Sequence, residues 1–332
     1  MERYVDMVSP ITGGRVKEVI KKETHQFRGF AFEVNSAYYV CEDTGEQFTE
    51  SSQDIILFNE LYSQYRLKTG IPFPEEIREI RERYGLNMTQ MTKILGFGAN
   101  QYARYEDGQV PSESNGKMLR SIESKEIMLN YLEMSRGEFS EDEYGRIRTK
   151  VLAAEPVSRN EREQQIFYGD TRRSILNGFS RFDCGKLKKM VAFFVAGEGE
   201  VFPTKLNKEM FYADFLHYRK YGRSISGLQY QALQFGPVPY HFATIYDNVE
   251  DINREYVFSH DQECLKLTCD NAGISGFSEE ELGILKTVLE KIRPMSTSKI
   301  VEESHKESAW QKYQADRSFI PYSEAFFLNL FN

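Results

Sequence analysis

Two hydrophobic periods occur along this chain, and each predicts one kind of element. Residues 15–24 and 28–41 alternate apolar and polar positions and are rich in Val, Phe and Tyr, which predicts a small antiparallel sheet. Residues 51–68 carry apolar side chains at the helical period, which predicts a helix. Pro74 suits the first turn of the next helix, and the pattern stays helical as far as Met134. We therefore expect a sheet followed by several helices.

The second half of the chain has a different pattern of hydrophobic and polar residues. Residues 136–181 are charged, lack a clear period and contain Pro156, which is typical of a linker with one or two loosely held helices. From Phe182 onward the chain is rich in aromatic residues. The pattern there predicts helices over 186–195 and 204–221, a strand over 225–235, a rigid turn at 236–239, a helix from Tyr240, a strand over 263–269, and capped helices after Ser278 and Ser296.

Together these patterns predict a mainly α protein with small β elements. We expect four segments: an N-terminal β-ribbon domain with its linker helix (1–70), an all-α helix-turn-helix domain (71–135), a linker (136–181), and a C-terminal, mostly helical α+β domain (182–332). The 332 residues are enough for two or three domains, and hydrophobic and aromatic contents of 40% and 14% argue against a disordered protein.

Composition also indicates which compartment and which partners to expect for the protein. No run of about 18 uncharged apolar residues occurs, and the N-terminus lacks the core of a signal peptide, so no membrane partner is expected. The four cysteines are scattered, which suits free thiols in a reducing compartment. We therefore expect a cytoplasmic protein. The net charge of -8 argues against a surface that binds nucleic acid everywhere, but a sequence-specific reader needs only one positive face.

Residues 85–108 have the pattern of a helix-turn-helix that reads DNA. Asn87 is a good N-cap, and Gln90 three positions later completes a capping box. Met91, Ile94 and Leu95 provide an inward face, and the turn carries Gly96 and Gly98. The stretch therefore predicts two short helices joined by a sharp turn.

The second of these helices carries the candidate chemistry. Asn100 and Arg104 are four residues apart and share its outer face, where Asn would pair with adenine and Arg with guanine. Glu106 is expected to be structural and to pair with Arg78 or Arg81. The residues expected to contact DNA are Lys93, Ala99, Asn100, Gln101 and Arg104. The alternative is a helical hairpin whose exposed Asn and Arg serve solubility alone.

The N-terminal sheet has the spacing of a zinc ribbon without its ligands. Ser9 and Thr12, then Cys41 and Thr44, stand two residues apart within each pair, and a glycine follows each pair. Hydroxyl groups are neutral at pH 7 and are poor zinc ligands, and a structural site needs four nitrogen or sulfur donors. We therefore predict no metal at these positions and no cofactor elsewhere in the chain.

Catalytic constellations are absent from the sequence. Cys184 and Cys264 have no neighbouring base, and Asp214 and His217 on one helix face are at a spacing that is usually structural. His241, His260 and His305 are isolated, and no phosphate loop, nucleophile elbow or HExxH string occurs. We predict that the protein is not an enzyme.

The N-terminal ribbon, the linker helix and the helix-turn-helix together resemble the MqsA-type antitoxins. In that family two cysteine knuckles hold zinc, and this chain departs from them at Ser9, Thr12 and Thr44. The resemblance implies that Asn100 and Arg104, ahead of Arg-Tyr-Glu-x-Gly, contact operator bases. Met88 replaces the Gln with which many relatives contact a phosphate, and that contact is then lost.

The C-terminal part, from about 182 to 326, resembles the SocA-like or Panacea domain. The string of residues 205–222, followed by Ile-Ser-Gly-Leu-Gln-Tyr from 225 and Phe-Gly-Pro-Val-Pro from 235, carries this resemblance. It implies a mostly helical domain that neutralises a toxin by direct binding. Independently of the family, a basic edge on this part would suit an acidic partner, such as the toxin, or a second phosphate contact, and its candidate residues are Lys205, Lys208, Arg219, Lys220 and Arg223. The alternative is that these cations form an ordinary solvated face.

The two resemblances imply an antitoxin of a type II toxin–antitoxin system that also represses its own operon. Its expected partners are double-stranded operator DNA, a toxin protein and a second copy of the chain, since palindromic operators are bound by dimers. Two alternatives stay open. One is a transcriptional repressor that senses a ligand or another protein without neutralising a toxin, and the other is a proteolytic adaptor.

Overall fold

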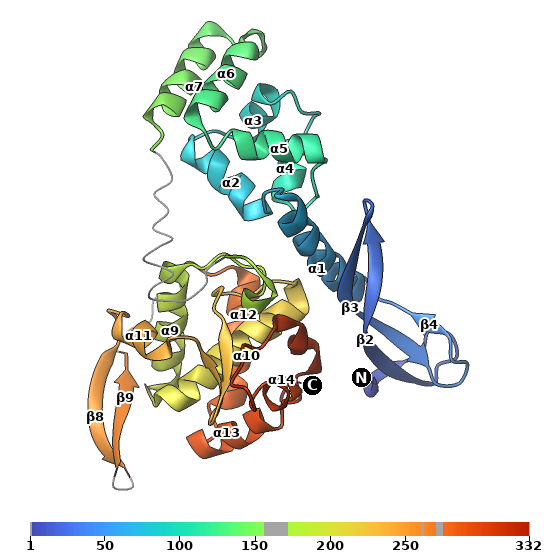
Figure 1. The fold of residues 1–332 in the computed structure, drawn as a ribbon, viewed down its shortest axis with the longest axis vertical. Coiled ribbons are helices and arrows are strands. Elements are labelled where there is room, and N and C mark those ends of the chain that lie inside the picture. Colours follow the sequence, from blue (N-terminus) through green and yellow to red (C-terminus); the bar gives the residue numbers. More distant parts are fainter. Residues whose placement is uncertain (1, 156–171, 260–261, 270–274, 332) are drawn as a thin grey trace. The chain divides into compact units, whose positions relative to one another are not determined.

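The computed structural model describes residues 2–155, 172–259, 262–269 and 275–331 (Figure 1). These residues form helices and small antiparallel sheets, which confirms the mixed composition expected from the sequence. They divide into two compact units. The first unit takes its described residues from 1–25, 33–60 and 160–332, and the second takes them from 26–32 and 61–159. Pro156 and most of the second half of the expected linker lie outside the described residues.

The N-terminal sheet has four strands in the order β1-β2-β3-β4. These are β1 (Glu2–Val8), β2 (Arg15–Phe27), β3 (Phe30–Cys41) and β4 (Gln47–Phe48). The two long strands confirm the sequence prediction, whereas β1 and β4 were not predicted. Val16, Val34 and Cys41 are buried in the sheet and give it an apolar core. Helix α1 (Ser51–Thr69) follows, as expected.

The second unit is a cluster of short helices around one hydrophobic core. Its elements are α2 (Pro74–Arg83), α3 (Met88–Ile94), α4 (Gln101–Glu106), α5 (Glu113–Ser121), α6 (Lys125–Met134), a 3-10 turn (Arg136–Glu138) and α7 (Glu141–Ala153). Helix α7 begins at the Ser140 N-cap and buries Tyr144, Ile147 and Val151 in the same core.

We expected loosely held helices in this stretch, and α7 differs from that expectation. Its three buried residues lie three and four positions apart, so they form one apolar stripe. Most of the remaining residues of the helix are polar or charged and exposed to solvent. An apolar stripe this narrow is hard to recognise in the sequence, because it stabilises a helix only when it packs against the core of the preceding helices.

The C-terminal part of the first unit is built around one buried helix, α10 (Pro203–Tyr221), in which every residue from Lys205 to Tyr218 is buried (Figure 1). The helices α9 (Cys184–Glu198), α12 (Glu279–Ile292) and α13 (Thr297–His305) pack against it. The remaining elements are β5 (Glu200–Val201), β6 (Tyr230–Leu233), β7 (Gly236–Pro239), α11 (Phe242–Asp247), β8 (Asn253–Ser259), β9 (Gln262–Thr268), α14 (Ser308–Gln311) and 3-10 helices at Ile175–Asn177 and Tyr322–Phe327.

Two predictions for this part need correction. Residues 236–239 were expected to be a turn, but they form strand β7, which pairs with β6 in the register Gln231↔Val238. The two prolines fit because a two-stranded sheet leaves each strand an outer edge where no N–H group is needed. The expected strand over 225–235 shortens to β6, because the backbone N–H groups of Ile225 and Ser226 donate to the Asp214 carboxylate instead of to a strand.

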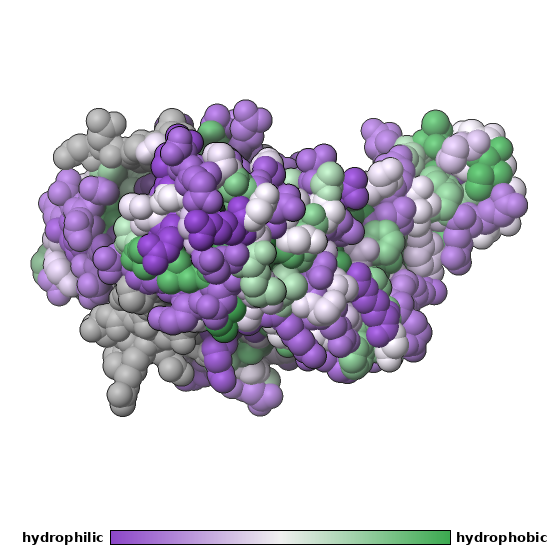
Figure 2. All heavy atoms as spheres, turned by 90° about the horizontal axis from the view of Figure 1, so that it is seen from above, coloured by the Kyte–Doolittle hydropathy of each residue, from purple (hydrophilic) through white to green (hydrophobic). Residues whose placement is uncertain are grey.

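The caps predicted for the late helices are confirmed. Ser278 and Glu281 form the capping box of α12, and the side chain of Ser296 accepts a hydrogen bond from the backbone of Lys299. Among the described helices, none combines the length and the hydrophobicity needed to cross a membrane. Seen from above, the surface is mostly hydrophilic, with hydrophobic residues gathered in small separate patches (Figure 2).

Candidate nucleic-acid interface

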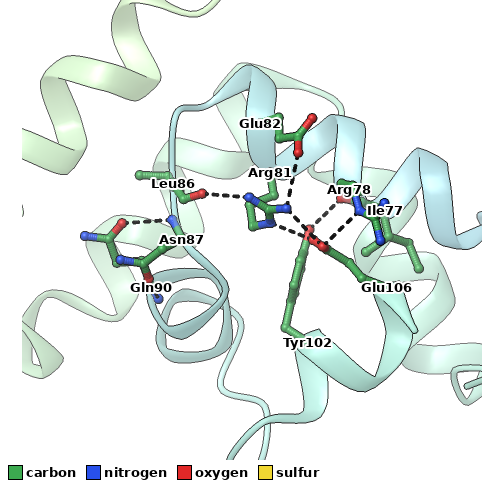
Figure 3. Close-up of polar contacts among 9 residues, drawn as sticks. All are labelled: Ile77, Arg78, Arg81, Glu82, Leu86, Asn87, Gln90, Tyr102 and Glu106. Atoms are coloured by element: carbon green, nitrogen blue, oxygen red, sulfur yellow. Dashed lines mark hydrogen bonds and ion pairs between the residues drawn. The ribbon is translucent and has the colours of Figure 1, made fainter. Parts of the chain in front are cut away.

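The first helix of the predicted helix-turn-helix begins where its caps place it. The backbone N–H of Gln90 donates to Asn87 Oδ1 at 2.8 Å, and the backbone N–H of Asn87 donates to Gln90 Oε1 at 3.2 Å (Figure 3). Met91 and Ile94 are buried on its inner face. The predicted capping box and apolar face are therefore confirmed, and α3 is held rigidly against the core of the second unit.

The turn after α3 depends on a glycine. Gly96 has a φ of 62°, a left-handed conformation that costs glycine little. The backbone N–H of Phe97 reaches back to the carbonyl of Thr92 at 2.9 Å, so the end of α3 is closed by its own backbone. The chain can then reverse within a few residues and start α4.

The second helix is shorter than expected, and this changes the position of Asn100. We placed Asn100 within the helix, but it is the N-cap of α4, with a φ of 61°. Asparagine tolerates this left-handed conformation better than most residues. The backbone N–H of Arg104 still donates to the carbonyl of Asn100 at 3.1 Å, so the two residues keep a fixed separation at the start of the helix.

The candidate contact residues differ in exposure. Ala99, Asn100 and Arg104 are exposed, whereas Gln101 is half-buried and its amide donates to Gln109 Oε1 at 3.1 Å. Lys93 is exposed, but its ammonium donates to the carbonyl of Glu138 at 3.1 Å. The structure therefore leaves the Asn100 and Arg104 side chains open to solvent and gives Lys93 and Gln101 partners within the protein.

The opposite side of α4 is anchored in the core. Tyr102 is fully buried, and its hydroxyl donates to the carbonyl of Ile77 at 2.8 Å. The Glu106 side chain is fully buried and accepts two hydrogen bonds from Arg81, at 2.6 and 2.9 Å, with Arg78 at 3.5 Å (Figure 3). The predicted pairing of Glu106 is confirmed with both arginines. Because this carboxylate turns inward, its negative charge is neutralised away from the outer face.

The outer face is hollowed between α3 and α4. A cavity of about 420 Å³ opens there. It is lined by Met88, Thr89, Thr92, Lys93, Gly96, Phe97, Ala99, Asn100, Ala103 and Glu138. Sequence reasoning missed Glu138, which comes from the turn after α6 and joins this surface only because α6 packs beside α3. The hollow is lined by apolar, hydroxyl-bearing, amide and charged residues, and the ammonium of Lys93 donates to the backbone carbonyl of Glu138.

The four positions with the zinc-ribbon spacing, Ser9, Thr12, Cys41 and Thr44, come together in the N-terminal sheet. Thr12 Oγ1 lies 3.3 Å from Cys41 Sγ, and hydrogen bonds from the hydroxyls of Ser9, Thr12 and Thr44 lower the pKa of the Cys41 thiol to about 6. These residues supply one sulfur where a structural zinc site needs four nitrogen or sulfur donors. Within the described ranges, no group of three His, Cys, Asp or Glu residues is placed to hold a metal ion.

The predicted basic edge of the C-terminal part does not form as one surface. Lys205 is buried, and its ammonium donates to Glu198 Oε2 at 2.7 Å and to the carbonyl of Arg293 at 3.1 Å. Lys208 is completely buried, and its ammonium donates to the carbonyl of Pro237 at 2.9 Å.

The remaining three cations of that prediction lie on α10 or just after it. Arg219 is half-buried and donates to the carbonyl of Phe331 at 2.8 Å, whereas Lys220 and Arg223 are exposed. The correction has a simple physical reason. Helix α10 is enclosed by its neighbours, so the cations along it turn to internal oxygen atoms.

Lys208 leads to a prediction about pH. Burial lowers the pKa of Lys208 to about 7, whereas an unfolded lysine has a pKa of about 10.4. Between these values the unfolded chain holds a proton that the folded chain has released, so this group makes the folded state more stable as the pH rises. The free energy of unfolding of the unmodified chain, relative to that of Lys208→Met, should therefore increase from pH 7 to pH 10 in urea unfolding experiments.

Lys220→Met, which removes an exposed lysine from the same helix, is the matched control. Parallel curves for the unmodified chain and Lys208→Met would contradict the prediction.

Asp214 and His217 lie close in sequence but have different partners. The Asp214 carboxylate accepts hydrogen bonds from the Ser226 backbone and from the Tyr230 hydroxyl, whereas His217 Nδ1 lies 2.6 Å from the carbonyl of Arg223. Burial lowers the pKa of His217 to about 4. Both residues therefore fasten the segment after α10 to that helix.

Similarity to known proteins is limited to the C-terminal part. Residues 206–311 match the family model described as "Antitoxin SocA-like, Panacea domain". The matched stretch runs from α10 to α14 and confirms the predicted resemblance for these residues. No curated protein and no solved structure matches the chain. The similarity of this domain to antitoxins suggests an antitoxin role, and the resemblance of the N-terminal part to MqsA-type antitoxins stays a prediction.

Proposed function

We propose that the protein is the antitoxin of a toxin–antitoxin system, that its C-terminal domain binds the toxin directly, and that its helix-turn-helix represses the operon encoding both proteins. One observation carries the proposal: a domain that matches SocA-like antitoxins is joined in one chain to a capped helix-turn-helix whose Asn100 and Arg104 are exposed. The proposed role requires one part that binds a protein and one part that binds DNA.

The DNA-binding half of the proposal is supported by the rigidity of α4. Its inner face is held by Tyr102 and Glu106, so the outer residues are presented without further ordering. Asn100 would then form two hydrogen bonds with an adenine, and Arg104 would form two with a guanine. A dimer would place two such helices about 34 Å apart, one turn of DNA, on a palindromic operator.

The hollow beside these residues adds to this half of the proposal. Ala99 and Ala103 contribute methyl groups to it, which suit contact with the methyl group of a thymine. Because the net charge of the chain is -8, binding should depend on this local surface.

The toxin-binding half rests on the family match. Of the five cations proposed for the toxin surface, Lys220 and Arg223 are the exposed ones and remain candidates. The buried Lys205 and Lys208 are assigned to the domain's own stability. A toxin-binding surface on this domain lies in a different unit from the helix-turn-helix, so the two binding activities should be separable by mutation.

Co-expression tests the proposal. Expression of the protein encoded by the gene adjacent to this one should arrest growth, and co-expression of the full chain should restore it. The Asn100→Ala, Arg104→Ala double variant should still restore growth but should no longer repress a reporter placed behind the operon's own promoter. A harmless neighbouring protein, or toxicity that the full chain does not relieve, would remove the antitoxin role and leave a repressor.

A further inference from the structure

Strand β8 is an outer strand that exposes aromatic side chains. It lies at the edge of the three-stranded sheet β5-β9-β8, and no described strand pairs with its other side (Figure 1). Tyr256 is 68% exposed and Phe258 is 83% exposed. Unpaired strand edges expose a row of N–H and C=O groups that can pair with another strand, and proteins usually protect such edges with charged side chains.

The charged residues of β8 do not protect this edge against pairing with another strand. Glu255 forms an ion pair with Lys266 of β9 at 2.9 Å, across the strand pair. The Arg254 guanidinium donates to the carbonyls of Tyr246 and Val249, within the same domain. Both charges are therefore satisfied by the chain itself. The segment Tyr256-Val257-Phe258 that follows them carries no charge, and its two aromatic side chains are not covered by the described residues.

This segment is complementary to itself. If two β8 strands pair antiparallel about a two-fold axis through Val257, each Tyr256 faces Phe258 of the second copy, and the two Val257 residues face each other. An axis through Glu255 would instead place two carboxylates opposite each other, and an axis through Tyr256 would place Glu255 opposite a valine. Aromatic cross-strand pairs are favourable and like charges are unfavourable, so the register through Val257 is preferred.

We propose that two copies of this chain associate by antiparallel pairing of their β8 strands about a two-fold axis at Val257, which joins the two sheets into one. Isologous two-fold contacts of this kind are the commonest arrangement in homodimers. The inference deepens the proposed function, because it gives the dimer of the proposed regulator a surface. It does not depend on the identity of the toxin.

The first test measures the molar mass of the full chain by light scattering after size-exclusion chromatography. The unmodified chain should have the mass of a dimer, and the Tyr256→Asp, Phe258→Asp variant should have the mass of a monomer. Phe235→Asp, which changes an exposed aromatic residue away from the edge (59% exposed), is the matched control and should stay dimeric. Because the changed side chains are largely exposed, the variant should keep the circular dichroism spectrum of the folded chain.

The second test examines the register by disulfide cross-linking. Val257→Cys should form a disulfide-linked dimer on mild oxidation, because residues directly opposite have Cβ atoms about 4.5–5.5 Å apart. Cys264 faces Val257 within the chain, so the experiment uses a Cys264→Ala background. Glu255→Cys in that background is the control and should not cross-link, since the proposed register separates the two copies of this position by four residues, about 13 Å.

Several outcomes would overturn the inference. A monomeric unmodified chain would do so, as would a dimer that the aspartate substitutions leave intact. Cross-linking at position 255 and not at 257 would refute the register. If the aspartate variant stays dimeric but no longer neutralises the toxin, the edge belongs to the toxin and not to a second copy. In the last case the proposed antitoxin role survives while this inference fails, so the two are distinguishable.

Discussion

Replacement of Asp214 with alanine should lower the free energy of unfolding of the first unit by about 3–5 kcal/mol, the largest stability effect that we expect from one substitution. Asp214 is fully buried in α10. Its carboxylate accepts hydrogen bonds from the backbone N–H groups of Ile225 and Ser226 and from the Tyr230 hydroxyl, each at 2.8 Å, and also from the Ser226 hydroxyl. Alanine leaves four buried donors without an acceptor.

Urea unfolding followed by the fluorescence of Trp310, the only tryptophan of the chain, measures this effect in the first unit. Asp214→Asn is the matched control, because its amide oxygen keeps one acceptor and its volume is unchanged. It should cost less than the alanine variant. A loss below about 1 kcal/mol for Asp214→Ala would mean that the segment after α10 finds other acceptors and that this network is not essential to the fold.

Replacement of Asn100 or Arg104 with alanine should weaken operator binding by about 1–3 kcal/mol each, roughly 5- to 150-fold in the dissociation constant. The reason is that each side chain is proposed to make a bidentate contact with one base. Arg104 is exposed within α4, so Arg104→Ala should leave the melting temperature unchanged, whereas Asn100→Ala should lower it slightly, because alanine tolerates the left-handed conformation at this position less well than asparagine. Fluorescence anisotropy with the operator fragment at fixed salt concentration measures the loss.

Arg148→Ala provides the control for this prediction, because it removes an exposed cation from α7 of the same unit. It should affect operator binding little. Each alanine variant should lose discrimination at one base pair, and the two should do so at different base pairs. Equal weakening on random DNA of the same length would show that the residues contact phosphates only, and the specific reading by α4 would have to be abandoned.

Much of the second unit was predictable because it depends on interactions between residues that are close in the sequence. The capping box of Asn87 and Gln90 lies within four residues, and so does the apolar face that begins at Met91. The inward turn of Glu106 was also predictable, since an acid on a surface that contacts phosphates would be repelled, and two arginines stand on the preceding helix. The two short helices α3 and α4 and the turn between them were therefore predictable before their packing was known.

Exposure and partners were harder to predict. The same lysine at the same helical spacing can be a surface charge or a buried donor, and the sequence of α10 does not distinguish the two. Lys208 is buried because strand β7 lies beside it and Pro237 offers a carbonyl. The position of Asn100 at the N-cap likewise depends on where the turn ends, which a shift of one or two residues in a short helix can change.

The sequence by itself determined the capped helices, the long strands, the shortage of zinc-binding residue types at the ribbon-like spacing and the resemblance of the C-terminal domain, because these depend on residue types and on spacings of a few positions. Only the tertiary structure decided that α7 belongs to the core of the second unit, that Lys205 and Lys208 are interior, and that β8 is left as an exposed edge. These properties depend on contacts between residues that are far apart in the chain. Burial is set by those neighbours and not by the buried residue alone.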